Sequence, residues 1–151
     1  NVCNVPASIK WPNDILINNK KVCGILTEMS AEIDKLNYII IGTGINVSTE
    51  FFDEELNKTA TSIFLETNKK FERKKIISEF LFEFEKYYNK FCEENGFSEI
   101  LEEYKQNCIT LNKKVKVLCK ESFLGTAVGV TEKGELIVKL MDGEERVVSS
   151  G

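Results

Sequence analysis

Lys10-Trp11-Pro12-Asn13-Asp14 opens the stretch of sequence that decides the fold, and the stretch ends at Asn46. Its second block is Lys20-Lys21-Val22-Cys23-Gly24-Ile25-Leu26, and its third is Ile39-Ile40-Ile41-Gly42-Thr43-Gly44-Ile45-Asn46. Each block sets an apolar, strand-like run beside lysine, carboxylate, glycine or asparagine side chains. We therefore expect these blocks to build a sheet that carries a polar binding site at its edge.

Turn-forming residues divide this stretch into predicted strands. We expect a strand at Ile15-Leu16-Ile17, a hairpin loop at Asn18-Asn19-Lys20-Lys21 and a return strand from Val22 to Met29. The apolar run Tyr38-Ile39-Ile40-Ile41 is typical of a strand that is covered on both faces. Trp11, which precedes these strands, is predicted to be a packed core residue and not a ligand contact.

The composition is that of a globular chain. Of its 151 residues, 42% are apolar and 29% are charged, and the net charge is -4. This apolar share is too high for a disordered chain. The lysines are scattered among glutamates, which argues against nucleic acid as a partner. No run of about 18 apolar residues occurs, so no membrane span is expected.

The cysteines and the absence of histidine limit the chemistry. The five cysteines have neither zinc-type nor Cys-x-x-Cys spacing, and we interpret them as reduced thiols of a cytoplasmic protein. Without histidine, no Ser-His-Asp or Cys-His nucleophile can be assembled. We expect electrostatic chemistry, in which lysine and backbone N–H groups, with or without a metal ion, neutralise an anionic substrate.

The rest of the sequence is expected to support this sheet. Ser62 is suited to cap a short helix at Ile63-Phe64-Leu65. Apolar residues at spacings of three and four predict a long helix over residues 73–92, whose aromatic stripe we assign to the core, and a shorter helix from about Ser98. Four alternating strands with tight turns then predict a small antiparallel barrel. These strands are Lys114 to Leu118, Gly125 to Val130, Glu135 to Leu140 and Glu144 to Val148.

In this order the blocks resemble the biotin protein ligases. The resemblance rests on Lys-Trp-Pro-Asn-Asp, Lys-x-x-Gly-Ile-Leu-x-Glu, Ile-Gly-x-Gly-Ile-Asn-Val and Ala-Thr-Ser, followed by the long helix and the small barrel. It covers almost the whole chain. It implies an α+β fold of the class II synthetase or biotin–lipoate ligase type, with a mixed sheet packed against helices. Residues 1–111 would be the C-terminal part of the catalytic domain, and residues 112–151 an SH3-like C-terminal domain.

The resemblance also implies a reaction and its participants. Biotin and MgATP would form biotinyl-5'-AMP, and the biotinyl group would pass to a lysine of the biotin carboxyl carrier domain of a biotin-dependent carboxylase. The biotin carboxylate itself attacks the α-phosphorus, so no protein nucleophile is needed. The cofactors implied are ATP and Mg²⁺, with biotin as substrate.

The site residues implied by the resemblance fall into two groups. Lys21 matches the lysine that holds the biotin carboxylate and the α-phosphate, Lys10 would add charge near the phosphates, and Asp14 would fix a lysine or a magnesium ion. The remaining residues would bind the substrates: Gly24, Ile25 and Leu26 the biotin, and Gly42, Gly44, Asn46 and Ala60 the nucleotide. The residues alone also allow Asp14 to be a turn-former.

The sequence departs from the family at its beginning. No Gly-Arg-Gly-Arg-type loop precedes Lys10, and no DNA-binding helix-turn-helix is present. We therefore expect the C-terminal part of a longer ligase, with little or no turnover by this chain alone. Two alternatives stay open, a lipoate-type acyl ligase and a non-catalytic module whose barrel docks a carrier protein. A homodimer formed through the central sheet is also left open, because no strand is marked as facing a partner.

Overall fold

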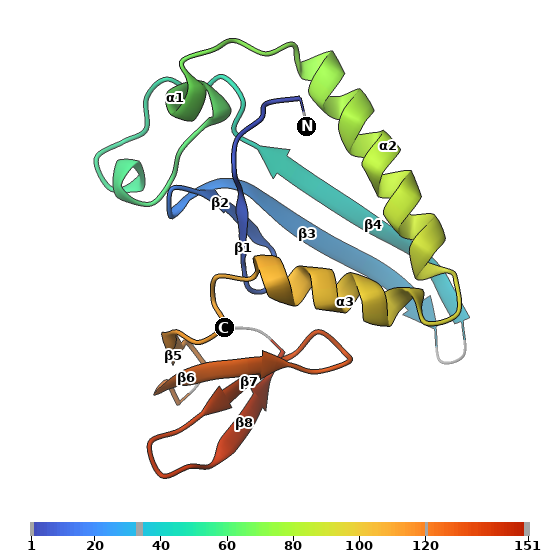
Figure 1. Cartoon of the computed structure of the whole chain (residues 1–151), viewed down its shortest axis with the longest axis vertical. Coiled ribbons are helices and arrows are strands. Elements are labelled where there is room, and N and C mark those ends of the chain that lie inside the picture. Colours follow the sequence, from blue (N-terminus) through green and yellow to red (C-terminus); the bar gives the residue numbers. More distant parts are fainter. Residues whose placement is uncertain (1, 33–34, 120, 150–151) are drawn as a thin grey trace. The chain divides into compact units, whose positions relative to one another are not determined.

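The computed structural model describes residues 2–32, 35–119 and 121–149, and its elements are labelled in Figure 1. The chain divides into two compact units, one of residues 1–7 and 13–76 and one of residues 8–12 and 77–151. Antiparallel strand pairs and helices occur together along the chain, which confirms the predicted α+β class. The boundary expected between residues 111 and 112 stays a prediction.

Three strands of the first unit form an antiparallel meander. They are β2 (Asp14–Ile17), β3 (Lys20–Glu32) and β4 (Lys35–Ile45). Asn18 and Asn19 turn the chain between β2 and β3 with φ of 50° and 64°, as the two-residue hairpin turn requires. The sequence implied a mixed sheet. These pairings are antiparallel because hairpins connect the strands, and a parallel contact occurs as one isolated bridge between Lys21 and Ala60.

The core of the first unit lies at one end of this meander. Its buried side chains are Ile17, Val22, Cys23 and Ile63. The expectation that the apolar run of β4 is covered on both faces is wrong, because Ile39, Ile40 and Ile41 are 51%, 53% and 46% exposed. β4 is an edge strand of the sheet. An uninterrupted apolar run identifies a strand, but it does not say which layers cover that strand.

Two short helices follow β4 in the first unit. The 3-10 helix η1 covers Leu56–Lys58, and α1 covers Ile63–Thr67. Ser62 caps α1 by accepting a hydrogen bond from the Leu65 N–H at 3.1 Å, which confirms the predicted cap.

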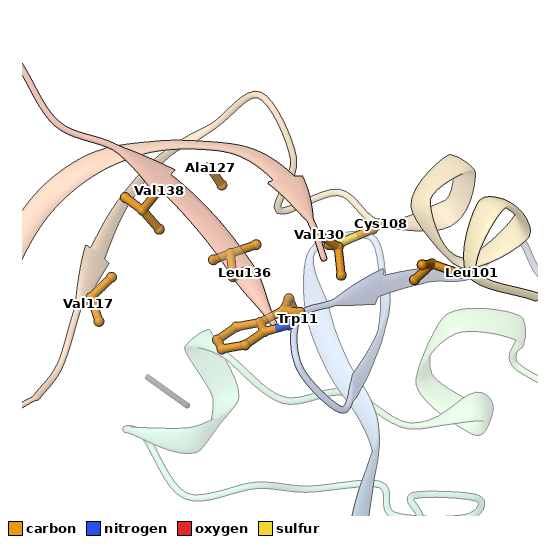
Figure 2. Close-up of a cluster of buried hydrophobic side chains, with 8 residues drawn as sticks. All are labelled: Trp11, Leu101, Cys108, Val117, Ala127, Val130, Leu136 and Val138. Carbon is orange, nitrogen blue, oxygen red and sulfur yellow. The ribbon is translucent and has the colours of Figure 1, made fainter. Parts of the chain in front are cut away.

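The second unit contains β1 (Ser8–Lys10), α3 (Gly96–Asn107) and a sheet of β5 (Lys114–Val117), β6 (Phe123–Val130), β7 (Leu136–Lys139) and β8 (Glu145–Val148). The four strands pair antiparallel in chain order, as the sequence predicts. Figure 2 shows the buried cluster of this unit, which includes Trp11, Leu101, Leu136 and Val138. The Trp11 indole is 7% exposed and donates to the Gly134 carbonyl at 2.9 Å, so its prediction as a core residue is confirmed.

Helix α2 (Arg73–Phe91) confirms the predicted helix but corrects the role of its aromatic stripe. No residue of α2 is buried, and Leu81 and Tyr88 are 56% and 57% exposed. Phe80, Phe84 and Tyr88 stack on one another along the helix, with ring centroids 6.1 Å apart in each pair. Apolar periodicity marks the face of a helix but not the surface that covers it. In the described part of the chain, no helix combines the length and apolarity that a membrane crossing requires.

Candidate functional site

Lys21 and Asp14 form an ion pair at the first hairpin of the first unit. Asp14 is the first residue of β2 and Lys21 the second of β3, and Lys21 Nζ lies 2.5 Å from Asp14 Oδ1. The Asp14 side chain is 19% exposed, whereas that of Lys21 is 48% exposed. The carboxylate therefore holds an ammonium group that remains open to solvent and can bind an anion.

A β-bulge turns Lys21 toward Asp14. Asp14 pairs with Gly24 and Ile15 with Cys23, but Leu16 pairs with Lys21, so Val22 is an extra residue in β3. In a regular strand, residues three apart point to opposite faces, and Lys21 would lie on the face opposite Gly24. The extra residue lets Val22 and Cys23 both enter the core, and it brings the Lys21 side chain beside Gly24.

Gly24 provides the space that the Lys21 side chain occupies. A Cβ atom at Gly24 would lie 3.0 Å from Cε and 3.1 Å from Nζ of Lys21, and 3.6 Å from Asp14 Oδ1. Across the sheet, Gly24 pairs with Gly44 of β4. The sheet surface at these two glycines therefore carries no side chains, and a ligand can approach the backbone closely there.

The segment around Ala60 lies along the start of β3. The Lys21 N–H donates to the Thr59 carbonyl at 2.7 Å, and the Thr61 N–H donates to the Lys21 carbonyl at 2.8 Å, which forms the parallel bridge between Lys21 and Ala60. Asn46 joins the same segment, because its Nδ2 group donates to the Thr61 carbonyl at 3.0 Å. The fold therefore brings together Lys21, Asn46 and Ala60, which are far apart in the sequence.

The predicted biotin-pocket residues Ile25 and Leu26 have different surroundings. Ile25 packs against the core of the first unit, its N–H donates to the Asn13 carbonyl at 3.0 Å, and its carbonyl accepts from Asn13 Nδ2. Leu26 is 61% exposed and pairs with Gly42 of β4. Leu26 thus offers an apolar contact surface, while Ile25 contributes to the core.

Cys23 lies next to the ion pair but is not suited to nucleophilic chemistry. Burial raises the pKa of its thiol, the nearby Lys21 charge lowers it by less, and the Asp14 charge raises it further. Because the net shift is upward, the thiol stays protonated at neutral pH. The ammonium group of Lys21 is then the group here that can act on an anion.

Two predictions concern Lys10 and the metal. Lys10 is an exposed residue that ends β1 in the second unit, and its role near phosphates stays a prediction. Among residues 2–32, 35–119 and 121–149, no group of three or more His, Cys, Asp or Glu side chains is arranged to hold a metal ion. Of the two partners predicted for Asp14, a lysine or a magnesium ion, the lysine is the one that it contacts.

Sequence reasoning did not single out three residues that organise this site: Asn13, Thr61 and Glu66. Asn13 and Thr61 were visible within the Lys-Trp-Pro-Asn-Asp and Ala-Thr-Ser blocks, so their motifs could have found them. Glu66 is one of many glutamates in this chain, and it comes to notice through its contacts with Asn18 and Thr61.

The chain thus combines antiparallel sheets with helices and carries a lysine–aspartate pair beside two paired glycines. A model of the biotin/lipoate A/B protein ligase family matches residues 1–46, and a model of the biotin protein ligase C-terminal domain matches residues 110–151. The chain belongs to the biotin protein ligases of this family.

Individual relatives agree with the family models. The chain is 39% identical over 150 residues to the bifunctional ligase/repressor BirA of Bacillus spizizenii, covering 97% of this chain and 46% of that protein. The apo structure of biotin protein ligase from Aquifex aeolicus is 32% identical with a TM-score of 0.86, covering 99% of this chain and 64% of that one. The same enzyme in complex with biotin and ATP is 31% identical with a TM-score of 0.82, at 99% and 62% coverage. The chain spans about half the length of the curated relatives it matches.

Proposed function

We propose that this chain contributes the Lys21 side of the active site of a biotin protein ligase. The reaction would be the ATP-dependent activation of biotin to biotinyl-5'-AMP and transfer of the biotinyl group to a lysine of a biotin carboxyl carrier domain. The observation that carries the proposal is the Lys21 ammonium, held 2.5 Å from Asp14 by a half-exposed side chain whose backbone bridges to Ala60. A homologous structure with biotin and ATP bound supports both small molecules as ligands.

The first step joins two anions. An oxygen of the biotin carboxylate forms a bond to the α-phosphorus of ATP, the bond between the α-phosphorus and its bridging oxygen to the β-phosphate breaks, and pyrophosphate leaves. Lys21 would lower the repulsion by placing one positive charge between the carboxylate and the α-phosphate. Asp14 would keep this ammonium in place, and bare backbone at Gly24 and Gly44 would let the phosphate approach.

The second step transfers the acyl group. The amine of a carrier lysine attacks the acyl carbon of biotinyl-5'-AMP, an amide bond forms, and AMP leaves with the electron pair of the broken acyl–oxygen bond. We propose as acceptor the carrier domain of a biotin-dependent carboxylase, such as acetyl-CoA carboxylase. The five free cysteines support a reducing, cytoplasmic location for this reaction.

A magnesium ion would enter this site with the nucleotide. Mg²⁺ in nucleotide sites is commonly held by one or two carboxylates together with substrate phosphates. The half-buried Asp14 carboxylate fits that role, so Asp14 would hold the ion together with the ATP phosphates. When bound, the ion neutralises phosphate charge, and the chain's own contribution remains the positioning of Lys21.

Calorimetric titration with biotinyl-5'-AMP tests the proposal. Lys21→Ala is expected to weaken binding by about 2 kcal/mol, or about thirtyfold, the scale of a lost charge-assisted hydrogen bond. Lys75→Ala is the matched control, because Lys75 is a lysine of the same unit whose 69% exposed side chain pairs with Glu72, away from this site. Equal losses in the two variants, or no binding by folded wild-type chain, would contradict the assignment.

A competition experiment between biotin and lipoate distinguishes a biotin protein ligase from a lipoate-type acyl ligase. The family model over residues 1–46 includes lipoate ligases, but the model over residues 110–151 is specific to biotin protein ligases and favours biotin. We expect biotin to displace biotinyl-5'-AMP at lower concentration than lipoate does. The non-catalytic alternative instead predicts carrier-domain binding that is unchanged in Lys21→Ala, together with no nucleotide binding.

A further inference from the structure

We infer that Glu66 is a positioning residue that fixes the nucleotide side of this site, an inference that rests on the function proposed above. Glu66 lies in α1, and its carboxylate accepts two hydrogen bonds. One comes from Thr61 Oγ1 to Oε1 at 2.5 Å, and the other from Asn18 Nδ2 to Oε2 at 2.6 Å. A single carboxylate thereby joins α1, the segment before it and the β2–β3 turn.

Thr61 connects Glu66 to two residues predicted to bind ligands, Lys21 through its backbone and Asn46 through its side chain. Its N–H donates to the Lys21 carbonyl at 2.8 Å, and its carbonyl accepts from Asn46 Nδ2 at 3.0 Å. Thr61 is 2% exposed, so its hydroxyl is removed from bulk water and depends on Glu66 as an acceptor. Removing the carboxylate leaves that buried hydroxyl to find another partner, and the cheapest response is a shift of the Thr59–Thr61 segment.

Asn18 connects Glu66 to the strand that carries Lys21. Asn18 adopts a left-handed φ of 50° in the two-residue turn, directly before β3. Lys20, the first residue of β3, also donates through its Nζ to the Asn57 carbonyl of η1. Two hydrogen bonds therefore hold the start of β3 against the segment that contains Ala60. The Lys20–Asn57 bond lies before Ala60 in the sequence, and the Asn18–Glu66 bond lies after it.

The location of these bonds predicts which ligand is affected. Of the four residues assigned to the nucleotide, Ala60 lies in the Thr59–Thr61 segment and Asn46 is bonded to it, whereas Gly42 and Gly44 lie in β4. Leu26 and the β3–β4 pairing beyond Gly24 lie farther along the strand and share no hydrogen bond with Glu66 among those described. Loss of Glu66 should therefore weaken binding of the adenylate more than binding of free biotin, which is expected to depend on this segment only through Lys21.

The test compares Glu66→Ala, Glu66→Gln and Glu72→Ala in this chain. Glu72 is the matched control, because it is a glutamate of the same unit whose 70% exposed side chain pairs with Lys75. Amide hydrogen exchange reports the position of the segment without any ligand. In Glu66→Ala, the Lys21 and Thr61 amides should exchange about tenfold faster, whereas the Ile25 amide, bonded to Asn13, should be unchanged.

Titrations complete the test. Glu66→Ala should weaken biotinyl-5'-AMP binding about tenfold and change biotin binding less than about twofold. Glu66→Gln should recover part of the loss, because its amide can accept from Asn18 and donate to the Thr61 hydroxyl. If Glu66→Ala does not fold, Glu66→Gln serves for both the exchange and the titration measurements.

The outcomes separate this inference from the proposed function. Unchanged Lys21 and Thr61 amides in a folded Glu66 variant would overturn the positioning role, whatever the ligand result. Equal losses of biotin and adenylate binding would show general disruption and would also overturn it. A wild-type chain that fails to bind the adenylate would contradict the proposed function, while the exchange data would still decide whether Glu66 holds the segment.

Discussion

Gly24→Ala is the substitution that most directly tests the geometry around Lys21. The added Cβ would lie 3.0 Å from Lys21 Cε and 3.1 Å from its Nζ, closer than ordinary carbon contacts. These atoms are the far end of a flexible side chain, so the lysine can move aside. We therefore expect the free energy of unfolding to fall by less than about 1 kcal/mol. The Lys21–Asp14 pair, by contrast, must separate or reorient.

Displacing the lysine should be visible in ligand binding. We expect biotinyl-5'-AMP to bind Gly24→Ala about five- to thirtyfold more weakly, equivalent to about 1–2 kcal/mol, because the charge is moved and not removed. Isothermal titration measures this loss of affinity. It should be done at a temperature where denaturation curves show that the wild type and Gly24→Ala are both folded. Gly129→Ala is the control, since its Cβ would meet Ile137 Cδ1 at an ordinary 3.4 Å in the second unit. Wild-type affinity in Gly24→Ala would refute the idea that this glycine reserves space for the lysine.

Two further predictions concern the second unit. Gly125→Ala should lower the free energy of unfolding in urea by more than about 2 kcal/mol. A Cβ at this position would lie 2.5 Å from Val138 Cγ1 and would overpack the core. An unchanged midpoint of urea unfolding would contradict this packing. The pKa of Tyr87 is raised to about 12, chiefly by its hydrogen bond to Glu103. The stability gained from the neutral phenol is therefore complete below pH 10 and is lost as the pH rises toward about 12. In Tyr87→Phe, absorbance at 295 nm should lack this late-titrating tyrosinate.

Much of this fold could be predicted from local sequence signals. The Ser62 cap and the strands after residue 112 depend on side chains and turns only a few residues apart, and each occurs where the sequence placed it. The hairpin turn is Asn18-Asn19, shorter than the predicted loop Asn18-Asn19-Lys20-Lys21, because Lys20 and Lys21 already pair with β2 in β3. The burial of Trp11 also agrees with its prediction. Such features are determined by local propensity, which a single sequence contains.

What the sequence could not predict depends on contacts between distant residues. The apolar stripe of α2 and the run at Ile39-Ile40-Ile41 were assigned to buried positions, yet no residue of either is buried, and only Ile76 of the stripe packs against a described core. Periodicity does not identify a covering layer. The site residues Lys21 and Asn46 were chosen by resemblance, and their roles remain predictions. Glu66 carries no motif, since its importance comes from hydrogen bonds to residues 5 and 48 positions away.

The bulge at Val22 interrupts the regular ladder between β2 and β3, but it supplies a backbone acceptor for Asn46. Deleting Val22 would restore an unbroken ladder between β2 and β3. The same deletion would keep Lys21 on the face of Gly24, because the two residues would then be two apart, but it would remove the buried Val22 side chain and the Val22 carbonyl that accepts from the Asn46 N–H at 2.8 Å. Directed evolution of this protein for heat resistance should therefore keep an apolar residue of similar size at position 22 and should not select its deletion, because the core and Asn46 would each lose a contact.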